Sequence, residues 1–248
     1  MRDFFFNVKS NLKSYNYIWK YKVLWCLPLI ILLVSLDWIS KSIVANSMVL
    51  DGVGTTFIPG LIKFKYTINP GAAYGMNAGK LGLAITIAAL VTLLLIAIFI
   101  FIRNKYWLIP ISLMVAGSVA NLLGRAWAPL TSDGIKGGVV DFIVFDFSFL
   151  GSDGYIFNLA DAWVSIAVGF IIVILIAYAV FEILEANMRK KDKEKYEFYV
   201  DIKTRKQILF ETYYEKFKFK DENKLTYRDY LSKNEKITKK WKKYKNKR

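Results

Sequence analysis

Long runs of hydrophobic residues are the dominant pattern of this chain. Four of them stand out, at residues 23–40, 81–102, 106–124 and 162–181, and only the first contains a charged residue, Asp37. A helix needs about 20 apolar residues to cross a bilayer, whereas helices of soluble proteins rarely lack a polar stripe over such lengths. The pattern therefore predicts four membrane-spanning helices rather than the buried core helices of a soluble protein.

Two segments between these runs have a different pattern, typical of β-strands. Residues 139–145, "VVDFIVF", are rich in β-branched and aromatic residues, and residues 53–75 have a similar character before they end in a Gly-rich segment. We expect these segments to form a small β-sheet on the outer surface of the membrane. The predicted fold is a mainly α membrane protein with four spanning helices and this sheet.

Lysine and arginine are distributed unevenly among the connecting segments. Residues 1–22 and 103–105 are basic. Residues 188–248 are basic as well, because they hold 22 Lys and Arg against 10 Asp and Glu. Short segments rich in Lys and Arg remain in the cytoplasm. Because four spans place these three segments on one side, we expect both termini in the cytoplasm and the two long loops outside.

This charge pattern suggests a division of the chain into three parts. We expect a basic cytoplasmic N-terminus over residues 1–22, a membrane domain over residues 23–185 and a basic cytoplasmic extension over residues 186–248. The extension mixes aromatic and basic residues, which favours adhesion to anionic lipid over binding to RNA. The first hydrophobic run is too long for a cleavable signal peptide, and Cys26, the only cysteine, cannot form an internal disulfide.

The chemistry open to this chain is limited because it contains no histidine. This excludes Ser-His and Cys-His nucleophile pairs and HExxH zinc sites. Charged or strongly polar groups at the ends of spans are functional candidates. On the predicted topology they gather at the outer face, where we expect Asp37 with Lys41, Asn121 with Arg125, and Asp161.

Structural explanations compete with function for several of these residues. Asp37 and Lys41 are four residues apart and can form an ion pair along one helix. Asn158 and Asp161 suit the first turn of a helix, as a cap and an acidic residue. We expect Asp146 and Asp153 to be solvent-side residues of a loop.

Asp141 has no such simple explanation. In an extended "VVDFIVF" it shares a row with Val139 and Ile143, where a lone carboxylate is costly to bury. A second carboxylate with which Asp141 could share a proton would lower this cost. Asp161 is the nearest candidate, so we expect the two to form a pair.

Five short motifs, in order along the chain, resemble those of the signal peptidase II family, aspartic proteases of the bacterial membrane. The motifs are "LDWISK", "INPGAAYG", "GSVANLLGRAW", "GGVVDF" and "FNLADAW", and the resemblance covers about residues 20–185. It assigns the catalytic aspartates to Asp141 and Asp161. The supporting and substrate-binding residues that it implies are Asp37, Lys41, Asn69, Gly71, Gly117, Asn121, Arg125 and Asn158.

The resemblance also implies a substrate and a location. The substrate is a prolipoprotein that carries a diacylglyceryl-modified cysteine, and the signal peptide is cut on the N-terminal side of that cysteine. We expect a monomer in the bacterial cytoplasmic membrane, with its site near the outer face and without a metal or cofactor. The family commonly has Asp where this chain has Gly124, so we expect Arg125 to pair with Asp37 instead.

Two other functions are compatible with parts of the sequence. A proton channel or transporter could use Asp37, Asp141 and Asp161 as a relay. A Ser-Lys peptidase could use the serines that flank Lys41, or Ser132 with Lys136. Neighbouring residues of a helix point in different directions, which disfavours the first of these Ser-Lys pairs.

Overall fold

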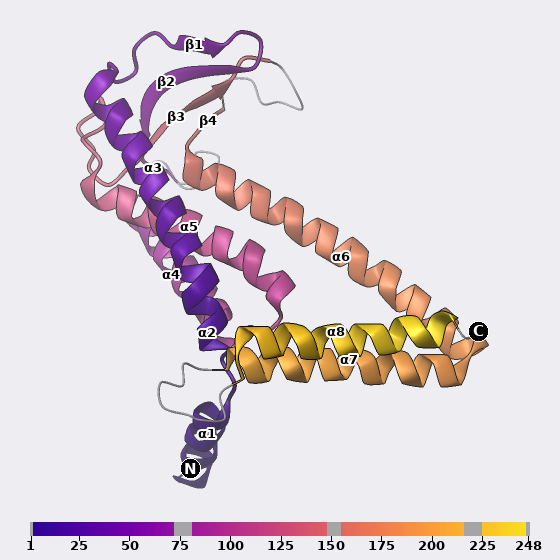
Figure 1. Cartoon of the computed structure of the whole chain (residues 1–248). Coiled ribbons are helices and arrows are strands. Elements are labelled where there is room, and N and C mark those ends of the chain that lie inside the picture. The colour runs from indigo at the N-terminus through magenta and orange to yellow at the C-terminus, as the bar shows by residue number, and fades with distance from the viewer. Residues whose placement is uncertain (1, 72–80, 148–154, 216–224, 247–248) are drawn as a thin grey trace. The chain divides into compact units, whose positions relative to one another are not determined.

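The computed structural model describes residues 2–71, 81–147, 155–215 and 225–246. It is mainly helical with one small antiparallel sheet, as the sequence predicted (Figure 1). The chain divides into two compact units. One comprises Cys26–Phe101 and Lys105–Ile171, and the other comprises Met1–Trp25, Ile102–Asn104 and Ile172–Arg248.

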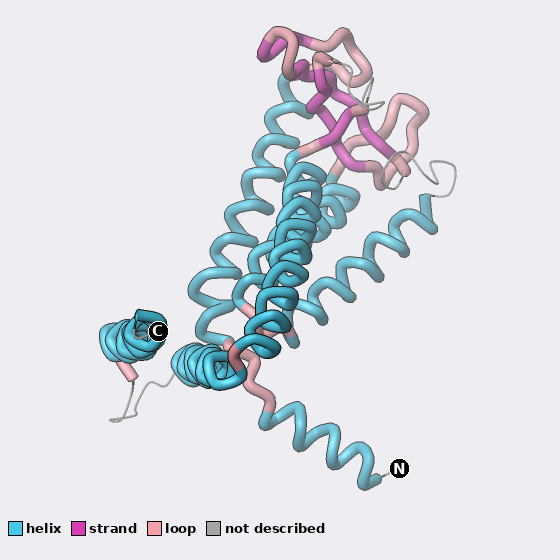
Figure 2. The backbone as a smooth tube through the Cα atoms, turned by 90° about the vertical axis from the view of Figure 1, so that its right-hand side faces the viewer, coloured by secondary structure: helices cyan, strands magenta, loops and turns pink. Residues whose placement is uncertain are grey.

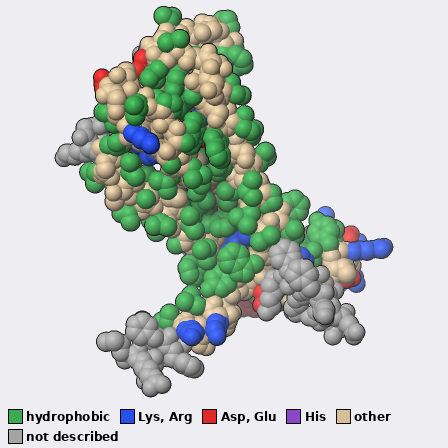
Figure 3. Space-filling view, turned by 90° about the vertical axis from the view of Figure 1, so that its left-hand side faces the viewer, with side chains coloured by type: hydrophobic (Ala, Val, Ile, Leu, Met, Phe, Trp, Pro, Cys, Tyr) green, Lys and Arg blue, Asp and Glu red, His purple; other side chains and the backbone are tan. Residues whose placement is uncertain are grey.

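Four helical stretches of the described residues are long and apolar enough to cross a membrane, which makes this a multi-pass membrane protein. They are Trp19–Ser47, α4 (Leu81–Phe101), α5 (Lys105–Trp127) and α6 (Leu159–Lys191). The first consists of α2 (Trp19–Tyr21), a π-helical segment (Lys22–Cys26) and α3 (Leu27–Ser47). Hydrophobic side chains cover much of the helical surface in view in Figure 3, as expected where lipid replaces water.

The helices extend beyond the hydrophobic runs that predicted them. The run at residues 162–181 lies within α6, which continues to Lys191. Backbone hydrogen bonding continues a helix after the apolar residues end, so hydropathy locates a span but not its last turn. The remaining helices are α1 (Arg2–Ser14), α7 (Lys193–Tyr214) and α8 (Tyr227–Asn246).

The sheet is formed by β1 (Thr55–Ile58), β2 (Ile62–Asn69), β3 (Val139–Phe145) and β4 (Ile156–Phe157), in that order. All neighbouring strands are antiparallel. It lies at one end of α3, α4 and α5 (Figures 1 and 2). The pairing of β2 with β3 confirms that the two predicted β-segments join in one sheet.

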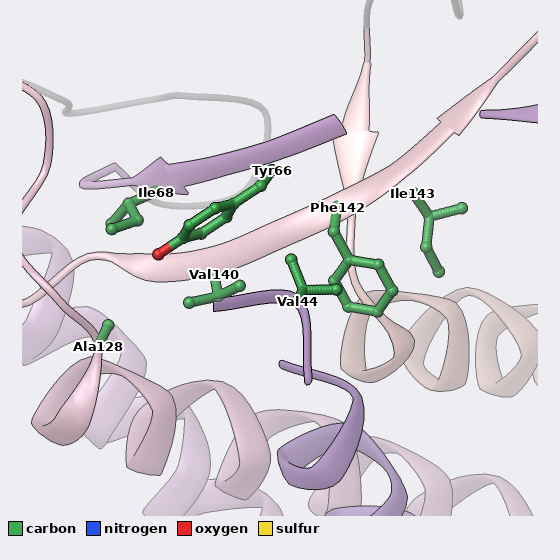
Figure 4. Packing of buried hydrophobic residues seen from close by; sticks show 7 residues of the cluster. All are labelled: Val44, Tyr66, Ile68, Ala128, Val140, Phe142 and Ile143. Atoms are coloured by element: carbon green, nitrogen blue, oxygen red, sulfur yellow. The ribbon is translucent and has the colours of Figure 1, made fainter. Parts of the chain in front are cut away.

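A hydrophobic cluster fastens the sheet to the helices (Figure 4). Its buried members are Val44 of α3, Ala128 just after α5, Tyr66 and Ile68 of β2, and Val140, Phe142 and Ile143 of β3. Alternation along β3 directs Val139 and Asp141 to the opposite row from Val140 and Phe142. Both rows are buried, so the carboxylate of Asp141 lies in an interior strand.

Gly117 allows α5 and α6 to approach closely. A Cβ atom on Gly117 would lie 2.5 Å from the carbonyl oxygen of Ala160 and 2.8 Å from Cγ2 of Val164. The backbone oxygen cannot move away without shifting the start of α6. Glycine at this position therefore sets the distance between the two helices.

We predict that Gly117→Ala lowers the free energy of unfolding by about 1–3 kcal/mol, because the added methyl group overpacks this crossing. Gly169→Ala is the matched control, since nothing lies within 4 Å of a Cβ atom there. Thermal unfolding in detergent micelles measures both. Equal melting temperatures for the two variants would contradict the proposed close crossing.

Candidate active site

The first turn of α6 positions two of the predicted residues through reciprocal hydrogen bonds. The backbone N–H of Asp161 donates to Oδ1 of Asn158 at 3.0 Å, and the N–H of Asn158 donates to Oδ2 of Asp161 at 3.2 Å. This is the geometry of a capping box, with an aspartate in the third position. The structural explanation offered by the sequence is thus correct, but these bonds leave Nδ2 of Asn158 and Oδ1 of Asp161 for other partners.

Asn158 connects this helix to β3. Its Nδ2 donates to Oδ1 of Asp141 at 2.6 Å and to Oδ1 of Asn121 at 3.1 Å. Asn69 of β2 donates to the other oxygen of Asp141 at 3.2 Å. One side chain, itself 1% exposed, therefore caps the helix that carries Asp161 and binds the carboxylate of Asp141.

Asn121 of α5 completes the connection from the other side. Its Nδ2 donates to Oδ1 of Asp161 at 2.8 Å, and its Oδ1 accepts from Nζ of Lys41 at 2.8 Å and from Asn158. A lysine can only donate and an ionised carboxylate can only accept, so these partners fix the orientation of the amide. Asn121 lies one helical turn after Gly117, whose missing side chain lets it reach α6.

A buried ion pair lies beneath the amides. Nζ of Lys41 is 2.7 Å from Oδ2 of Asp37, and each side chain is 1% exposed. Oδ1 of Asp37 accepts a hydrogen bond from the backbone N–H of Ala160 at 2.8 Å. A carboxylate at the start of a helix is stabilised by the free N–H groups there. This pair therefore ties α3 to α6 and, through Lys41 and Asn121, to α5.

The expected pairing of Arg125 with Asp37 is wrong. The guanidinium of Arg125 instead donates to the carbonyl oxygens of Gly71 and Gly137. Asp37 is neutralised by the lysine one turn further along its own helix. Arg125 therefore holds the backbone where β2 ends and β3 begins, and Gly71 in turn donates its N–H to Oδ1 of Asn69 at 2.9 Å.

Two glycines near the site have different surroundings. A Cβ atom on Gly124 would meet only Nζ of Lys41 at 3.6 Å and Cγ1 of Val139 at 3.7 Å, which are ordinary contacts. On Gly138 it would lie 2.5 Å from Cγ2 of Ile68 and 3.0 Å from the oxygen of Asn69. The sequence reasoning did not single out Gly138, although its place in "GGVVDF", directly before a strand, was the available signal.

The other aspartates of this region lie elsewhere. Asp146 follows β3, where it forms an ion pair with Lys63 and accepts the N–H of Gly60 at 3.1 Å. The hydrogen bond from Lys63 is the main reason that the pKa of Asp146 lies below its usual range. Asp153 and residues 72–75 of "INPGAAYG" lie outside the described residues.

Asp141 has the opposite environment. The pKa of this carboxyl group is raised from 3.8 to about 7, first by burial and then by repulsion from Asp161, against the hydrogen bonds from Asn158 and Asn69. A buried acid that keeps its proton near neutral pH beside a second carboxylate can take part in acid–base chemistry. Within the described ranges, no group of three or more His, Cys, Asp or Glu residues is arranged to hold a metal.

Comparison with known proteins relates this arrangement to one family. The family model described as signal peptidase (SPase) II matches residues 29–177. The lipoprotein signal peptidase of Staphylococcus haemolyticus is 34% identical over 161 residues, which covers 63% of this chain and 94% of that protein. The lipoprotein signal peptidase of Staphylococcus aureus is 32% identical over 168 residues, which covers 66% and 90%.

Two solved structures share the fold. Both are described as a bacterial membrane enzyme, solved by the in meso method at 2.3 and 1.9 Å resolution. The first is 29% identical, with a TM-score of 0.55 over 64% of this chain and 91% of that chain. The second is 30% identical, with a TM-score of 0.53 over 63% and 95%.

The first prediction from this site concerns the buried ion pair. Lys41→Met should lower the free energy of unfolding by about 3–5 kcal/mol, because it leaves the charge of Asp37 buried without a partner. Adding Asp37→Asn should restore part of the loss. Chemical unfolding of the single and double variants measures this coupling.

The control for this experiment is an exposed ion pair with the same spacing. Glu235 and Lys239 are 2.7 Å apart on α8, but their side chains are 64% and 72% exposed. Lys239→Met should cost less than about 1 kcal/mol. If Lys41→Met cost no more than this control, the buried pair would not be what holds the three helices together.

A second prediction concerns pH. The folded protein binds a proton at Asp141 more tightly than the unfolded chain does, since its pKa is about 7 rather than 3.8. This group therefore stabilises the fold fully below pH 4, and its contribution is lost as the pH rises towards 7. We expect the melting temperature of the wild type to fall over this interval relative to that of Asp141→Asn. Parallel pH profiles for the two proteins would contradict the burial of a protonated Asp141.

Proposed function

This chain belongs to the signal peptidase II family, and we propose that it is an aspartic endopeptidase that removes the signal peptides of bacterial prolipoproteins. Membership of the family supports the processing of prolipoproteins. The aspartic mechanism is supported by one observation above all. The amide of Asn158 joins Asp141 to the capping box of Asp161, so that carboxyl groups from β3 and α6 share one set of hydrogen bonds.

In the proposed mechanism the two carboxyl groups have different roles. Asp161 is the base: its carboxylate accepts hydrogen bonds from the N–H of Asn158 and from Asn121, and it lies at a helix N-terminus. It removes a proton from the attacking water. Asp141 is the acid: its buried carboxyl group keeps its proton and donates a hydrogen bond to the carbonyl oxygen of the scissile bond. The two titrate jointly, so these roles describe the dominant arrangement of one shared proton.

The other polar residues of the site have supporting roles in this proposal. Asn121, Asn158 and Asn69 orient the two carboxyl groups, since the side-chain amide of each donates to one of them. Asp37 and Lys41 fix the start of α6 relative to α3. Arg125 and Gly71 shape the backbone beside the dyad, where the peptide would bind.

The proposed substrate is a precursor whose cysteine carries a diacylglyceryl group. The enzyme would cut on the N-terminal side of that cysteine without a metal or cofactor. Apolar side chains are exposed along the spans, for example Leu90 and Leu94 of α4 at 61% and 60%. Such surfaces allow acyl chains and a signal helix to approach from the bilayer rather than from water.

The proposed topology follows from the distribution of basic residues. The segments at residues 1–22, 103–105 and 186–248 lie in the cytoplasm, and the sheet and the dyad lie near the outer face of the cytoplasmic membrane. Residues 23–185 form the peptidase domain, and we propose a monomer. A proton channel is less favoured, because the three acidic residues invoked for it meet at one end of the spans instead of following a path along them.

The central test is the replacement of each member of the dyad. Asp141→Asn and Asp161→Asn keep shape and hydrogen bonding but remove one ionisable group. Each should lower the rate of cleavage by at least about 10²–10⁴-fold, and the losses should be non-additive because the pair acts as a unit. The measurement is mass spectrometry of the products from diacylglyceryl-modified and unmodified precursors.

Asp146→Asn and Asp153→Asn are the controls and should cleave at near wild-type rates. Asp146 contacts Lys63 and Gly60 rather than the dyad, so its loss affects only the edge of the sheet. An active Asp141→Asn or Asp161→Asn variant would refute the mechanism. An inactive Asp146→Asn variant would mean that the wrong aspartate of the segment "VVDFIVFD" has been assigned.

A further inference from the structure

The C-terminal extension is a helical hairpin that is attached to the ends of the spans. Three contacts of α7 show the attachment. Lys203 forms an ion pair of 2.6 Å with Glu185 near the end of α6, and Glu211 forms one of 3.3 Å with Arg103, in the link between α4 and α5. The carbonyl oxygen of Glu215, directly after α7, accepts from the N–H of Trp19 at 3.1 Å.

Aromatic and cationic contacts strengthen the junction with the first span. The ring of Tyr21 packs edge-on against Phe210 at 5.4 Å and against Tyr214 at 5.0 Å between ring centres. Nζ of Lys20 lies 3.4 Å from the ring centre of Tyr213. Each of these contacts involves the last turns of α7. The helix therefore meets the fourth span along its first half and the first span at its end.

These contacts determine how α7 runs relative to the membrane. A helix of 22 residues is about 33 Å long, and this one touches residues that begin the first span, join the second to the third and end the fourth. One helix can meet all of these ends only if it lies across them. The boundary between lipid and water on that side is thus where α7 lies.

α8 packs on α7 through an aromatic stripe. The ring of Trp241 is 5.6 Å from that of Tyr199, Tyr244 is 4.4 Å from Phe198, and Tyr230 is 4.8 Å from Tyr213. The two helices run antiparallel, side by side (Figure 1). These three aromatic residues of α8 therefore pack within the hairpin, whereas Tyr227 at its start is 54% exposed.

The rest of the surface of α8 is basic. Its basic side chains, all exposed, are Arg228, Lys233, Lys236, Lys239, Lys240, Lys242, Lys243 and Lys245. Asp229 and Glu235 are the acidic residues of this helix. At 100° per residue, Lys236 and Lys243 lie about 140° and 160° around the helix from Trp241, and Lys240 lies about 100° from it. We call these three exposed lysines the lysine face.

We propose that the lysine face of α8 binds the phosphate-bearing headgroups of anionic lipids beside the spans. This inference is independent of the proposed peptidase activity. α8 packs on α7, which contacts the ends of the spans, so the proposal places the lysine face beside the lipid headgroups. Lysines are compact point charges that suit phosphate groups, and each one near an anionic surface strengthens association about fivefold.

Nucleic acid is the other polyanion that a basic helix could bind. Proteins that bind single-stranded nucleic acid combine positive charge with exposed aromatic rings on which bases stack. In α8 the rings of Tyr230, Trp241 and Tyr244 pack against α7. The lysine face therefore offers charge without a stacking surface, which favours lipid headgroups.

The experiment uses the full chain reconstituted in nanodiscs. A fluorophore is attached at Ser232→Cys, an exposed position of α8, in a Cys26→Ala background. Its quenching by lipids that carry a nitroxide in the headgroup is compared between zwitterionic discs and discs with one third phosphatidylglycerol. We expect strong quenching only with the anionic lipid, and its loss when the salt concentration is raised.

Matched variants test the lysine face itself. Changing Lys236, Lys240 and Lys243 to Gln should weaken docking at least about tenfold, whereas changing them to Arg should preserve it. Replacing Lys193, Lys195 and Lys206 of α7 by Gln removes the same charge and should have little effect. The emission in zwitterionic discs, which should be the same for all variants, reports that the hairpin remains folded.

Several outcomes would overturn the proposal. Equal quenching in both kinds of disc would show that headgroup charge does not recruit α8. An equal loss from the α7 control would show that only total charge matters. Binding of a labelled RNA oligomer to the protein in zwitterionic discs, abolished by the Gln variant, would assign the lysine face to nucleic acid instead. We expect cleavage activity to be the same in all these variants, so failure here and failure of the peptidase proposal are distinguishable.

Discussion

The first turn of α6 is the point on which the arrangement of the site depends. Free N–H groups at a helix start need acceptors, and three side chains supply them to this turn. Asp37 comes from α3, and Asn158 and Asp161 come from the turn itself. The side chains that satisfy the helix start are thereby held where Asn121 of α5 and Asp141 of β3 can reach them. Capping a helix and assembling the site are achieved by the same hydrogen bonds.

This dual use explains which parts of the site were predictable. Hydropathy identified the four spans, and β-branched residues identified β2 and β3. Burial in lipid and pairing in a sheet each require a local pattern of residue types, and such a pattern is visible in the sequence. The capping role of Asn158 was visible from its spacing to Asp161. Its hydrogen bond to Asp141 was not visible in this way. The amide N–H groups of Asn158 that capping leaves free find their partners through the tertiary structure, which the spacing along the chain does not give.

The error over Arg125 has a similar physical origin. The sequence pairs the arginine with Asp37 because Gly124 replaces the carboxylate that the family commonly has before the arginine. Lys41 is four residues from Asp37 on one helix and reaches it without crossing to another element. Carbonyl oxygens at strand ends also accept hydrogen bonds from a guanidinium, and no sequence pattern marks them. The helical hairpin of the extension was missed as well, because its aromatic contacts join residues that lie far apart in the sequence.

The charges around the proposed dyad explain why it should hold a single proton. Two cations, Lys41 and Arg125, lie near it, and two anions balance them if Asp37 and Asp161 are ionised. Ionising Asp141 as well would leave an uncompensated negative charge on a strand buried along both rows, where burial is costly. The family commonly has a further carboxylate at the position of Gly124, and a side chain there would lie beside Nζ of Lys41. With glycine instead, Lys41 serves only Asp37 and Asn121 among its described hydrogen-bond and ion-pair partners. The amide of Asn121 then lies between this lysine and Asp161, accepting a hydrogen bond from the first and donating one to the second.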